Sequence, residues 1–198
     1  MRFVIGLLLC LIQLSTYSQT YQDSIREIRV KHYAELTDPK NEILSQEEID
    51  HFQGLDYFLI DTSWIINATY KKKKGPKFEM ITTTDRRPVY RRAGYIYCKK
   101  DSIEFRLTVY KNIALSKQEE YKDYLFIPFR DKTSGKDSYG GGRYIDLSKP
   151  KQKEVKIDFN LAYNPYCSYS DKFSCPIPPE ENTLSIEIKA GEKTPIGH

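Results

Sequence analysis

The sequence has few of the residues and patterns that mark common catalytic or metal sites. It contains three histidines, at 32, 51 and 198, and none lies within residues 124–182, where other polar residues gather. It has neither a GxSxG motif nor a GxxxxGK[ST] motif, so nothing indicates a nucleophile elbow or a phosphate-binding loop. The cysteines form no CxxC pattern of the kind that holds zinc. The sequence therefore assigns no reaction, and we predict no metal and no cofactor.

Long apolar runs are absent after residue 18. Residues 1–18 have the layout of a secretory signal, with Arg2, an apolar run up to Leu14, and small residues at Thr16 and Ser18. We therefore expect cleavage after Ser18, export to the periplasm or the extracellular space, and no membrane attachment of the mature chain. An uncleaved anchor helix is the alternative, although a bilayer span takes about 20 apolar residues.

The charge balance favours no particular class of partner. The chain carries 31 basic and 27 acidic residues. Removing residues 1–18 takes away one arginine and leaves 30 minus 27, or +3. Such a mild excess does not indicate nucleic-acid binding. Two basic clusters, Lys71–Lys74 with Lys77 and Arg86–Arg87 with Arg91–Arg92, are interpreted as surface charge, with binding to an anionic surface as the alternative.

The pattern of short apolar runs predicts a mainly β protein. No long helix separates one predicted strand from the next, which argues against a parallel βαβ sheet. We predict an antiparallel β-barrel or sandwich of about nine strands with one or two N-terminal helices, forming a single domain from residue 19 to 198. The predicted strands are residues 56–61, 64–70, 77–84, 89–100, 101–112, 124–129, 143–147, 154–160 and 183–190.

Helix signals are confined to the start of the chain. A helical period over about residues 21–35 ends at Asp38-Pro39, because the residue before a proline disfavours the helical conformation. A second short helix begins after Ser45, since Ser45 and Glu48 have the spacing of a capping box.

Several long motifs follow one another in a fixed order. They are FQGLDYF (52–58), FIPFRDKTSG (126–135), YGGGRYIDL (139–147), DFNLAYNPYCSYS (158–170), CPIPPEEN (175–182) and AGEK (190–193). On these motifs the chain, from about residue 20 onward, resembles the bacterial and archaeal family called domain of unknown function 1684. Ser138 and Ile145 are mild departures, where threonine and leucine are commoner. The resemblance implies a shared C-terminal block without a named chemistry.

Residues 124–182 contain the candidate site. The glycines at 140–142 would form an anion-binding nest beside Arg143, or simply a turn or bulge between strands. Asp158 and Asn160 project from the same side of their predicted strand. We expect a small polar or anionic ligand, with Arg143 holding an anion and Asp158 and Asn160 orienting it. The candidate ligand-binding residues are Tyr139, Gly140, Gly141, Gly142, Arg143, Asp158, Asn160 and Asn164.

Two alternatives remain open for this block. It could belong to a hydrolase or transferase that uses Asp158 with Arg143, although nothing singles out a pair of acids. It could also be purely structural, with Arg143 and Asp158 forming an ion pair that closes the fold.

The three cysteines beyond residue 18 divide into a pair and a single residue. In an oxidising compartment we expect Cys167 and Cys175 to form a disulfide, which would stabilise the fold by about 2.5 kcal/mol for so short a loop. Cys98 lies within a predicted strand and is expected to be buried and inert. A thiolate metal site is the less favoured alternative.

Overall fold

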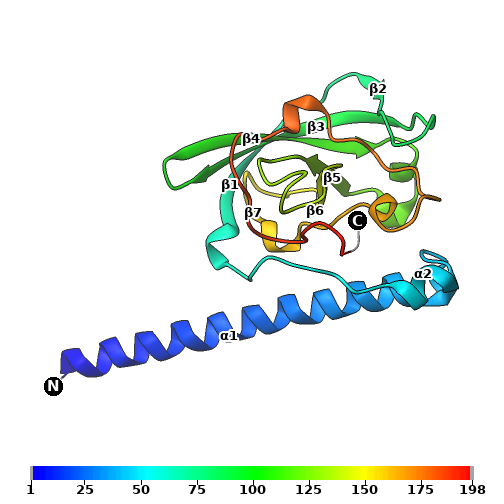
Figure 1. Cartoon of the computed structure of the whole chain (residues 1–198). Helices are drawn as coiled ribbons and strands as arrows, with labels where there is room; N and C mark the ends of the chain where they lie inside the picture. The colour runs from blue at the N-terminus through cyan, green and yellow to red at the C-terminus, as the bar shows by residue number, and fades with distance from the viewer. Residues whose placement is uncertain (1, 197–198) are drawn as a thin grey trace. The chain divides into compact units, whose positions relative to one another are not determined.

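The chain forms two compact units, Met1–Ile49 and Asp50–His198 (Figure 1). The computed structural model describes residues 2–196, with side chains from residue 19 onward. The predicted signal peptide and its cleavage after Ser18 involve side chains outside this part, so they remain predictions. Within the described residues, no helix has an apolar stretch that would cross a membrane.

The first unit is helical. It consists of α1 (Arg2–Thr37), the 3-10 turn η1 (Pro39–Asn41) and most of α2 (Gln46–His51). Asp38 follows α1 and accepts a hydrogen bond from the Lys40 N–H. The predicted capping box is confirmed, because Ser45 Oγ accepts from the Glu48 N–H at 3.2 Å and Glu48 Oε2 accepts from the Ser45 N–H at 2.6 Å.

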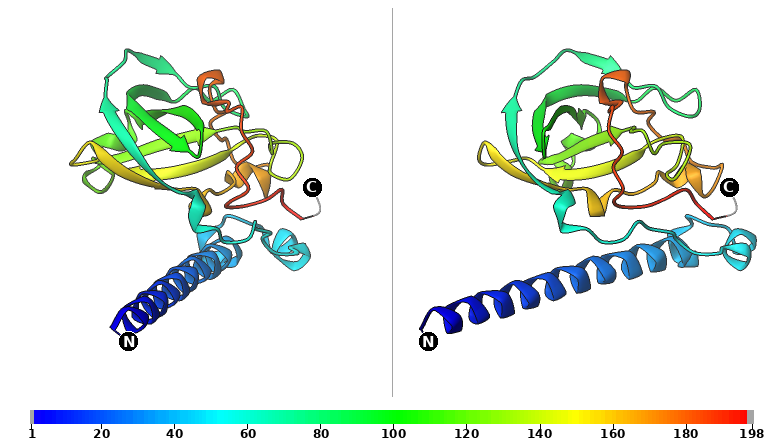
Figure 2. Two further views of the ribbon diagram at one scale, coloured as in Figure 1. Left: turned by 90° about the vertical axis from the view of Figure 1, so that its left-hand side faces the viewer. Right: turned by 60° about the vertical axis from the view of Figure 1, so that its left-hand side comes forward.

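The second unit is built on a seven-stranded antiparallel sheet in the order β6-β5-β4-β3-β1-β7, with β2 paired to β3. The strands are β1 (Ile65–Lys72), β2 (Lys77–Glu79), β3 (Val89–Lys100), β4 (Ile103–Asn112), β5 (Tyr124–Phe129), β6 (Arg143–Ser148) and β7 (Glu154–Asp158). The unit also contains short 3-10 turns. One precedes β1, two lie between β4 and β5, and three follow β7: η2 (Thr62–Trp64), η3 (Leu115–Lys117), η4 (Glu119–Tyr121), η5 (Phe159–Leu161), η6 (Tyr166–Ser168) and η7 (Glu180–Asn182). The sheet curls into part of a barrel (Figure 2).

The mainly β, antiparallel prediction is confirmed, but two of the nine predicted strands are not strands. Residues 56–61 contribute a single bridge, between Tyr57 and Glu192. Residues 183–190 bury alternate side chains as predicted, yet their backbone does not join a ladder. The Ile188 N–H, for example, donates to the Asp131 carboxylate at 2.6 Å. Among the described residues, the segment forms only a single bridge, between Thr183 and Arg130, with further backbone bonds from Leu184 to Arg130 and from Lys132 to Ile186. Alternation predicts which side chains are buried and does not by itself establish a ladder.

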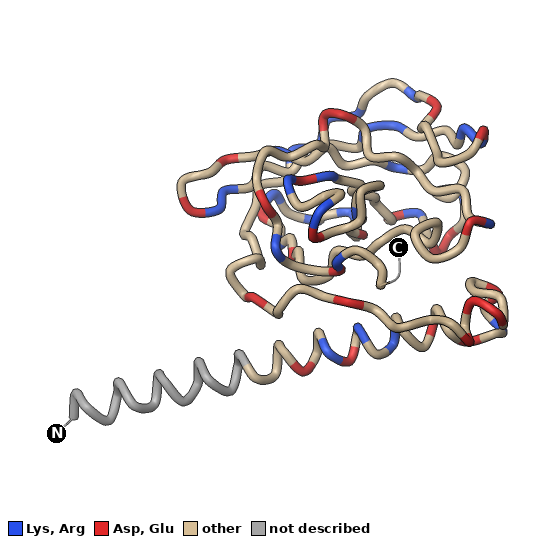
Figure 3. The backbone as a smooth tube through the Cα atoms, viewed as in Figure 1, with Lys and Arg blue, Asp and Glu red and all other residues tan. Residues whose placement is uncertain are grey.

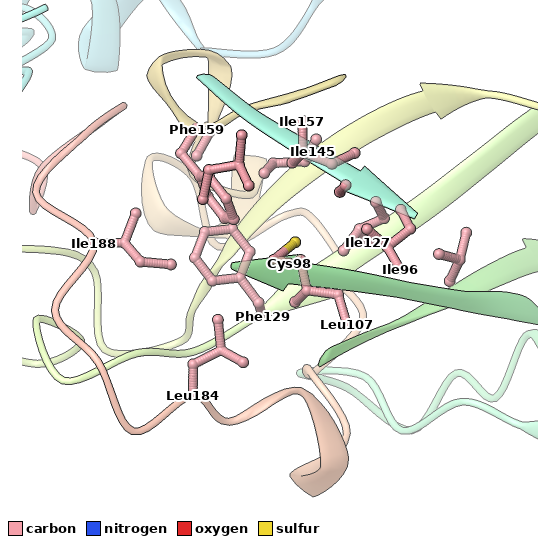
Figure 4. Packing of buried hydrophobic residues seen from close by; sticks show 14 of the residues in the cluster. Ile96, Cys98, Leu107, Ile127, Phe129, Ile145, Ile157, Phe159, Leu184 and Ile188 are labelled. Carbon is pink, nitrogen blue, oxygen red and sulfur yellow. The ribbon is translucent and has the colours of Figure 1, made fainter. Parts of the chain in front are cut away.

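The two faces of the sheet carry separate apolar clusters. On the concave face, the partners Tyr70, Ile96 and Leu107 continue into a large core that also includes Phe129 and Phe159 (Figure 4). Residues on the opposite face form a second, aromatic cluster, composed of Met80, Tyr90, Tyr110, Phe126 and Tyr144. Because the chain after β7 covers part of that opposite face, the sheet is buried on both sides there.

Strands β4 and β5 diverge, and one side chain fills the gap. Their only ladder partners within the described residues are Tyr110 and Phe126. Beyond that pair the buried Asn182 amide lies between them. Its oxygen accepts from the Thr108 N–H at 2.7 Å, and its nitrogen donates to the carbonyls of Thr108 at 2.9 Å and Pro128 at 2.7 Å. Asn182 thus replaces the missing ladder bonds.

Candidate functional site

Arg143 is a buried structural cation. It begins β6 and lies on the concave face, since Arg143 pairs with Phe129 and Ile145 pairs with Ile127. The side chain is fully buried, and its guanidinium forms an ion pair with the equally buried Asp131 at 3.3 Å. Burial lowers the pKa of Arg143, and Asp131 opposes that shift.

Three further hydrogen bonds of the Arg143 guanidinium reach the C-terminal segment, while its buried Nε has no hydrogen-bond partner within the described residues. Its guanidinium donates to the carbonyls of Ala190 at 2.5 Å, Ile188 at 2.9 Å and Glu192 at 3.1 Å. Since an arginine so enclosed cannot contact solvent, it fastens the segment after residue 183 to β6. The structural alternative paired Arg143 with Asp158, whereas its carboxylate partner in the structure is Asp131.

Asn164 belongs to a second buried network around the Glu192 carboxylate. The carboxylate accepts from the Asn164 N–H at 2.6 Å, from the Tyr169 hydroxyl at 2.9 Å and from the Tyr57 hydroxyl at 3.1 Å. The Asn164 amide donates to the Lys193 carbonyl at 2.7 Å. Glu192 also contacts Arg143 through its backbone carbonyl, so Asn164 and Arg143 are linked through one residue.

Asp158 and Asn160 lie together and bond to each other and to the backbone of Asp61. The Asp158 carboxylate caps η5 by accepting from the Asn160 N–H at 3.0 Å. The Asn160 amide pairs with the backbone of Asp61, accepting at 3.0 Å and donating at 2.9 Å. The structure therefore does not bring Asp158 together with Arg143, whose carboxylate partner is Asp131.

The three glycines form a tight turn that leads into β6. The Gly142 N–H donates to the Tyr139 carbonyl at 3.0 Å, so it is used within the turn. Gly142 has a φ of +92°, and a Cβ there would lie 2.6 Å from the Phe129 carbonyl oxygen. A Cβ at Gly141 would collide with the Tyr139 ring, whereas Gly140 faces a more open space. The turn requires glycine at two of its three positions.

Tyr139 lies beside the two paired cysteines. Cys167 and Cys175 are free thiols here, and the Cys167 N–H donates to Cys175 Sγ at 3.2 Å. Burial, and then the neighbouring Cys167, raise the pKa of Tyr139. The disulfide stays a prediction. Among the described residues, no group of three or more His, Cys, Asp or Glu side chains could hold a metal ion.

The concave face carries a different feature at its other end, a cavity of about 240 Å³ that we call the basic pocket. It is lined by Tyr70, Lys72, Lys74, Arg91, Ala93, Lys111, Ile113, Ser116, Leu125 and Lys149. On β5, Phe129, beside Arg143, comes four positions after Leu125, which lies at this pocket. At about 3.3 Å per residue, the two ends lie about 13 Å apart along the strand.

The floor of the basic pocket is apolar, and its rim is cationic. Tyr70, Ala93 and Leu125 are buried, and the Tyr70 hydroxyl donates to the Ala93 carbonyl. Five of the lining residues are lysine or arginine, and none of the lining residues, all described, is acidic. Elsewhere on the same unit, Lys and Arg alternate with Asp and Glu along the backbone (Figure 3). The pocket therefore concentrates one sign of charge.

Three cations lie side by side on adjacent strands, and two of them, Arg91 and Lys111, line the basic pocket. Arg91 on β3 pairs with Lys111 on β4 and with Lys77 on β2. Like charges directly opposite one another in a sheet destabilise it. The Arg91 Nε is moreover buried and has no hydrogen-bond partner within the described part of the chain. This arrangement costs folding energy unless an anion neutralises it.

A larger cavity of about 630 Å³ has no such character. Its charged lining residues are Lys99 and Arg106 against Glu104 and Glu181. Lys99 and Glu104 form an ion pair at 3.8 Å. Because the charges there balance, this cavity offers a weaker basis for selecting a ligand.

The basic pocket was missed in the sequence, although its signal is present. On β1 the concave positions run Ile66, Ala68, Tyr70 and then Lys72, and on β4 Val109 is followed by Lys111. When every second residue of a strand is apolar and the last one is basic, the strand runs from the core to a charged edge of that face. Lys71–Lys74 are exposed, in agreement with their interpretation as surface charge. That interpretation did not use the strand register, which brings Lys72, Lys74 and Arg91 to one pocket.

Comparison with known proteins places this arrangement in a family. The family described as "Protein of unknown function (DUF1684)" matches residues 50–193. A solved structure, the solution NMR structure of an uncharacterized protein of Haloarcula marismortui, is similar with a TM-score of 0.67 and 33% sequence identity. That match covers 92% of this chain and 99% of the other. No curated protein matches. By the extent of these matches, the chain belongs to the DUF1684 family.

Proposed function

We propose that this protein binds a small anionic ligand with an apolar portion in the basic pocket. The adjacent cations Arg91 and Lys111, which line a pocket without any acidic residue, carry the proposal. An anion there would separate like charges and give the Arg91 Nε an acceptor. Hydrogen bonds to charged groups contribute about 1.5–3 kcal/mol each, so two such contacts account for specific binding.

The surrounding charges leave these cations available. Lys72, Lys74 and Arg91 form no ion pair with any described residue. Lys149 contacts Asp123 at 3.6 Å, but both side chains are more than half exposed, and exposed pairs contribute about 0–1 kcal/mol. A ligand anion therefore competes with one weak ion pair and with the hydrogen bond that Lys111 Nζ donates to the Lys122 carbonyl.

The size and floor of the pocket narrow the ligand class. Pockets for drug-sized ligands measure about 300–1,000 Å³, and this one is smaller, at about 240 Å³. The buried floor of Tyr70, Ala93 and Leu125 suits an aromatic ring or a short acyl chain. A phosphate monoester or carboxylate carrying such a group fits both the floor and the rim.

Calorimetric titration with phenyl phosphate tests the proposal. We expect binding that weakens as salt is raised, with weaker binding of inorganic phosphate and of phenol, each of which lacks one half of the ligand. Arg91→Gln and Lys111→Gln should each weaken binding about tenfold or more, which corresponds to 1.4 kcal/mol.

Lys117→Gln is the matched control, because Lys117 is exposed on η3 and does not line the pocket. It should leave the affinity unchanged. If phenyl phosphate fails to bind, or if the three glutamine variants bind it equally well, the basic pocket is not the binding site for this ligand class.

A further inference from the structure

The second feature of interest is the pair of cysteines that lies apart from the basic pocket. The segment of Thr83 and that of Cys175 bind each other, with the Thr83 N–H donating to the Cys175 carbonyl at 2.9 Å and the Cys175 N–H donating to Thr83 Oγ1 at 3.1 Å. These bonds fix Cys175. Cys167 on η6 is held against it by its own N–H, which donates to Cys175 Sγ at 3.2 Å. Two cysteines eight residues apart thus share one site.

The two thiols differ in environment. Cys167 is half-buried, while Cys175 is buried with 7% of its surface exposed. A hydrogen bond from Cys175, followed by those from Thr83 and Tyr139, lowers the pKa of Cys167 to about 7. The same hydrogen bond raises the pKa of Cys175, because Cys175 donates its proton to the Cys167 sulfur. Cys167 is therefore the more accessible and the more readily ionised of the two thiols.

Cys98 provides an internal contrast. It lies in the core on β3 with 3% of its surface exposed. Burial raises the pKa of Cys98 to about 12, as expected for an inert structural thiol. A difference in reactivity between Cys98 and the pair Cys167 and Cys175 should therefore reflect their local environments and not the general reactivity of cysteine.

We propose that Cys167 and Cys175 form a reactive dithiol, in which Cys167 attacks a small-molecule disulfide and Cys175 completes the exchange. The adjacency of the two sulfurs and the greater access of Cys167 assign these roles. An attacking thiol is most effective when its pKa lies near the ambient pH. Tyr139, which the sequence placed among the ligand-binding residues, is here a positioning residue whose hydroxyl faces the Cys167 sulfur.

The exchange is a two-electron oxidation of the protein by a disulfide such as oxidised glutathione. The Cys167 thiolate forms a bond to one glutathione sulfur, the glutathione S–S bond breaks, and the released thiolate takes up a proton. Cys175 then loses its proton and attacks Cys167 Sγ, which expels the second glutathione as a thiol. The products are the Cys167–Cys175 disulfide and two reduced glutathione molecules.

Several charged or titratable groups face the two thiols, and each can influence the pH dependence. They are Tyr139, Tyr144, Arg86 and Asp171. Because Arg86 is cationic and Asp171 anionic, their effects on the thiolate oppose each other. The hydroxyl and thiol donors nearest Cys167 therefore set its ionisation.

The test uses the reduced full chain and measures alkylation by iodoacetamide, followed by peptide mass mapping. We expect Cys167 to be alkylated about tenfold or more faster than Cys98 near neutral pH, with a rate that rises through a midpoint near pH 7. Tyr139→Phe removes one donor to the thiolate and should move this midpoint to higher pH.

Oxidised glutathione then tests the exchange. The chain should lose two hydrogen atoms and link Cys167 to Cys175. Cys175→Ser should instead stop at a Cys167–glutathione mixed disulfide, while Cys98→Ser, the matched control, should behave as the parent does. The proposal is overturned if Cys167 reacts no faster than Cys98, or if glutathione attaches to Cys175 first. A Cys167–Cys175 bond that excess reduced glutathione does not open in the native protein would also overturn it, because the bond would then be a permanent brace.

Discussion

Replacing Arg143 with methionine is expected to lower the free energy of unfolding by about 3–5 kcal/mol. The substitution keeps most of the side-chain volume but leaves the Asp131 carboxylate buried without its cation. Removing one partner of a buried ion pair typically costs about 3–5 kcal/mol. It also leaves three carbonyls of the C-terminal segment without their donor. Urea unfolding followed by tyrosine fluorescence measures the change.

Arg87→Met is the matched control, since Arg87 is exposed and its loss should change stability by less than about 0.5 kcal/mol. Arg143→Met combined with Asp131→Asn should recover part of the loss, because the second change removes the uncompensated charge. A stability loss below about 1 kcal/mol for Arg143→Met would contradict a structural role. Loss of phenyl phosphate binding with unchanged stability would instead return Arg143 to the binding site.

Asn182→Ala should cost about 3 kcal/mol of stability. The change removes three buried hydrogen bonds and leaves the N–H and C=O of Thr108 and the carbonyl of Pro128 without partners. Each bond contributes about 1 kcal/mol. Because Asn182 replaces ladder bonds between β4 and β5, the effect should be concentrated there. Hydrogen exchange at the Thr108 amide should accelerate more than exchange at amides of β1.

Asn67→Ala controls for the loss of an asparagine, because Asn67 lies on β1 with an exposed side chain. It should change stability little. Asn182→Asp gives a further comparison, since it retains the acceptor for the Thr108 N–H but places an oxygen against two carbonyls. An aspartate variant as stable as the parent would contradict the assigned hydrogen bonds.

The fold class followed from the sequence because alternation and turn residues act locally. Period-two runs such as that in β4 and the capping box at Ser45 depend on neighbours within a few residues. Residues 183–190 could not be assigned in this way. Their alternation is real, but whether the backbone joins a ladder depends on Asp131, which is 57 residues away from Ile188.

The candidate site was harder to predict, since contacts between distant residues decide it. Arg143 beside a glycine turn has the composition of an anion site, and its partner could equally be a ligand or a carboxylate. The structure places Asp131 in that position. The pairing of Arg91 with Lys111, by contrast, depends on a bulge between Arg92 and Gly94, and without that register the two cations have no visible relation.

The buried Arg143 network limits which ligands the concave interior of the sheet can accept. One end of this interior is closed by the ion pair of Arg143 and Asp131, and its middle is filled by the core. For the proposed ligand of the basic pocket, we therefore expect the apolar part to rest on the floor of Tyr70 and Leu125 and the charge to stay among the rim lysines. A molecule charged at both ends would have to place one charge on that floor, where burial without a partner is costly. We therefore predict weaker binding of doubly charged molecules.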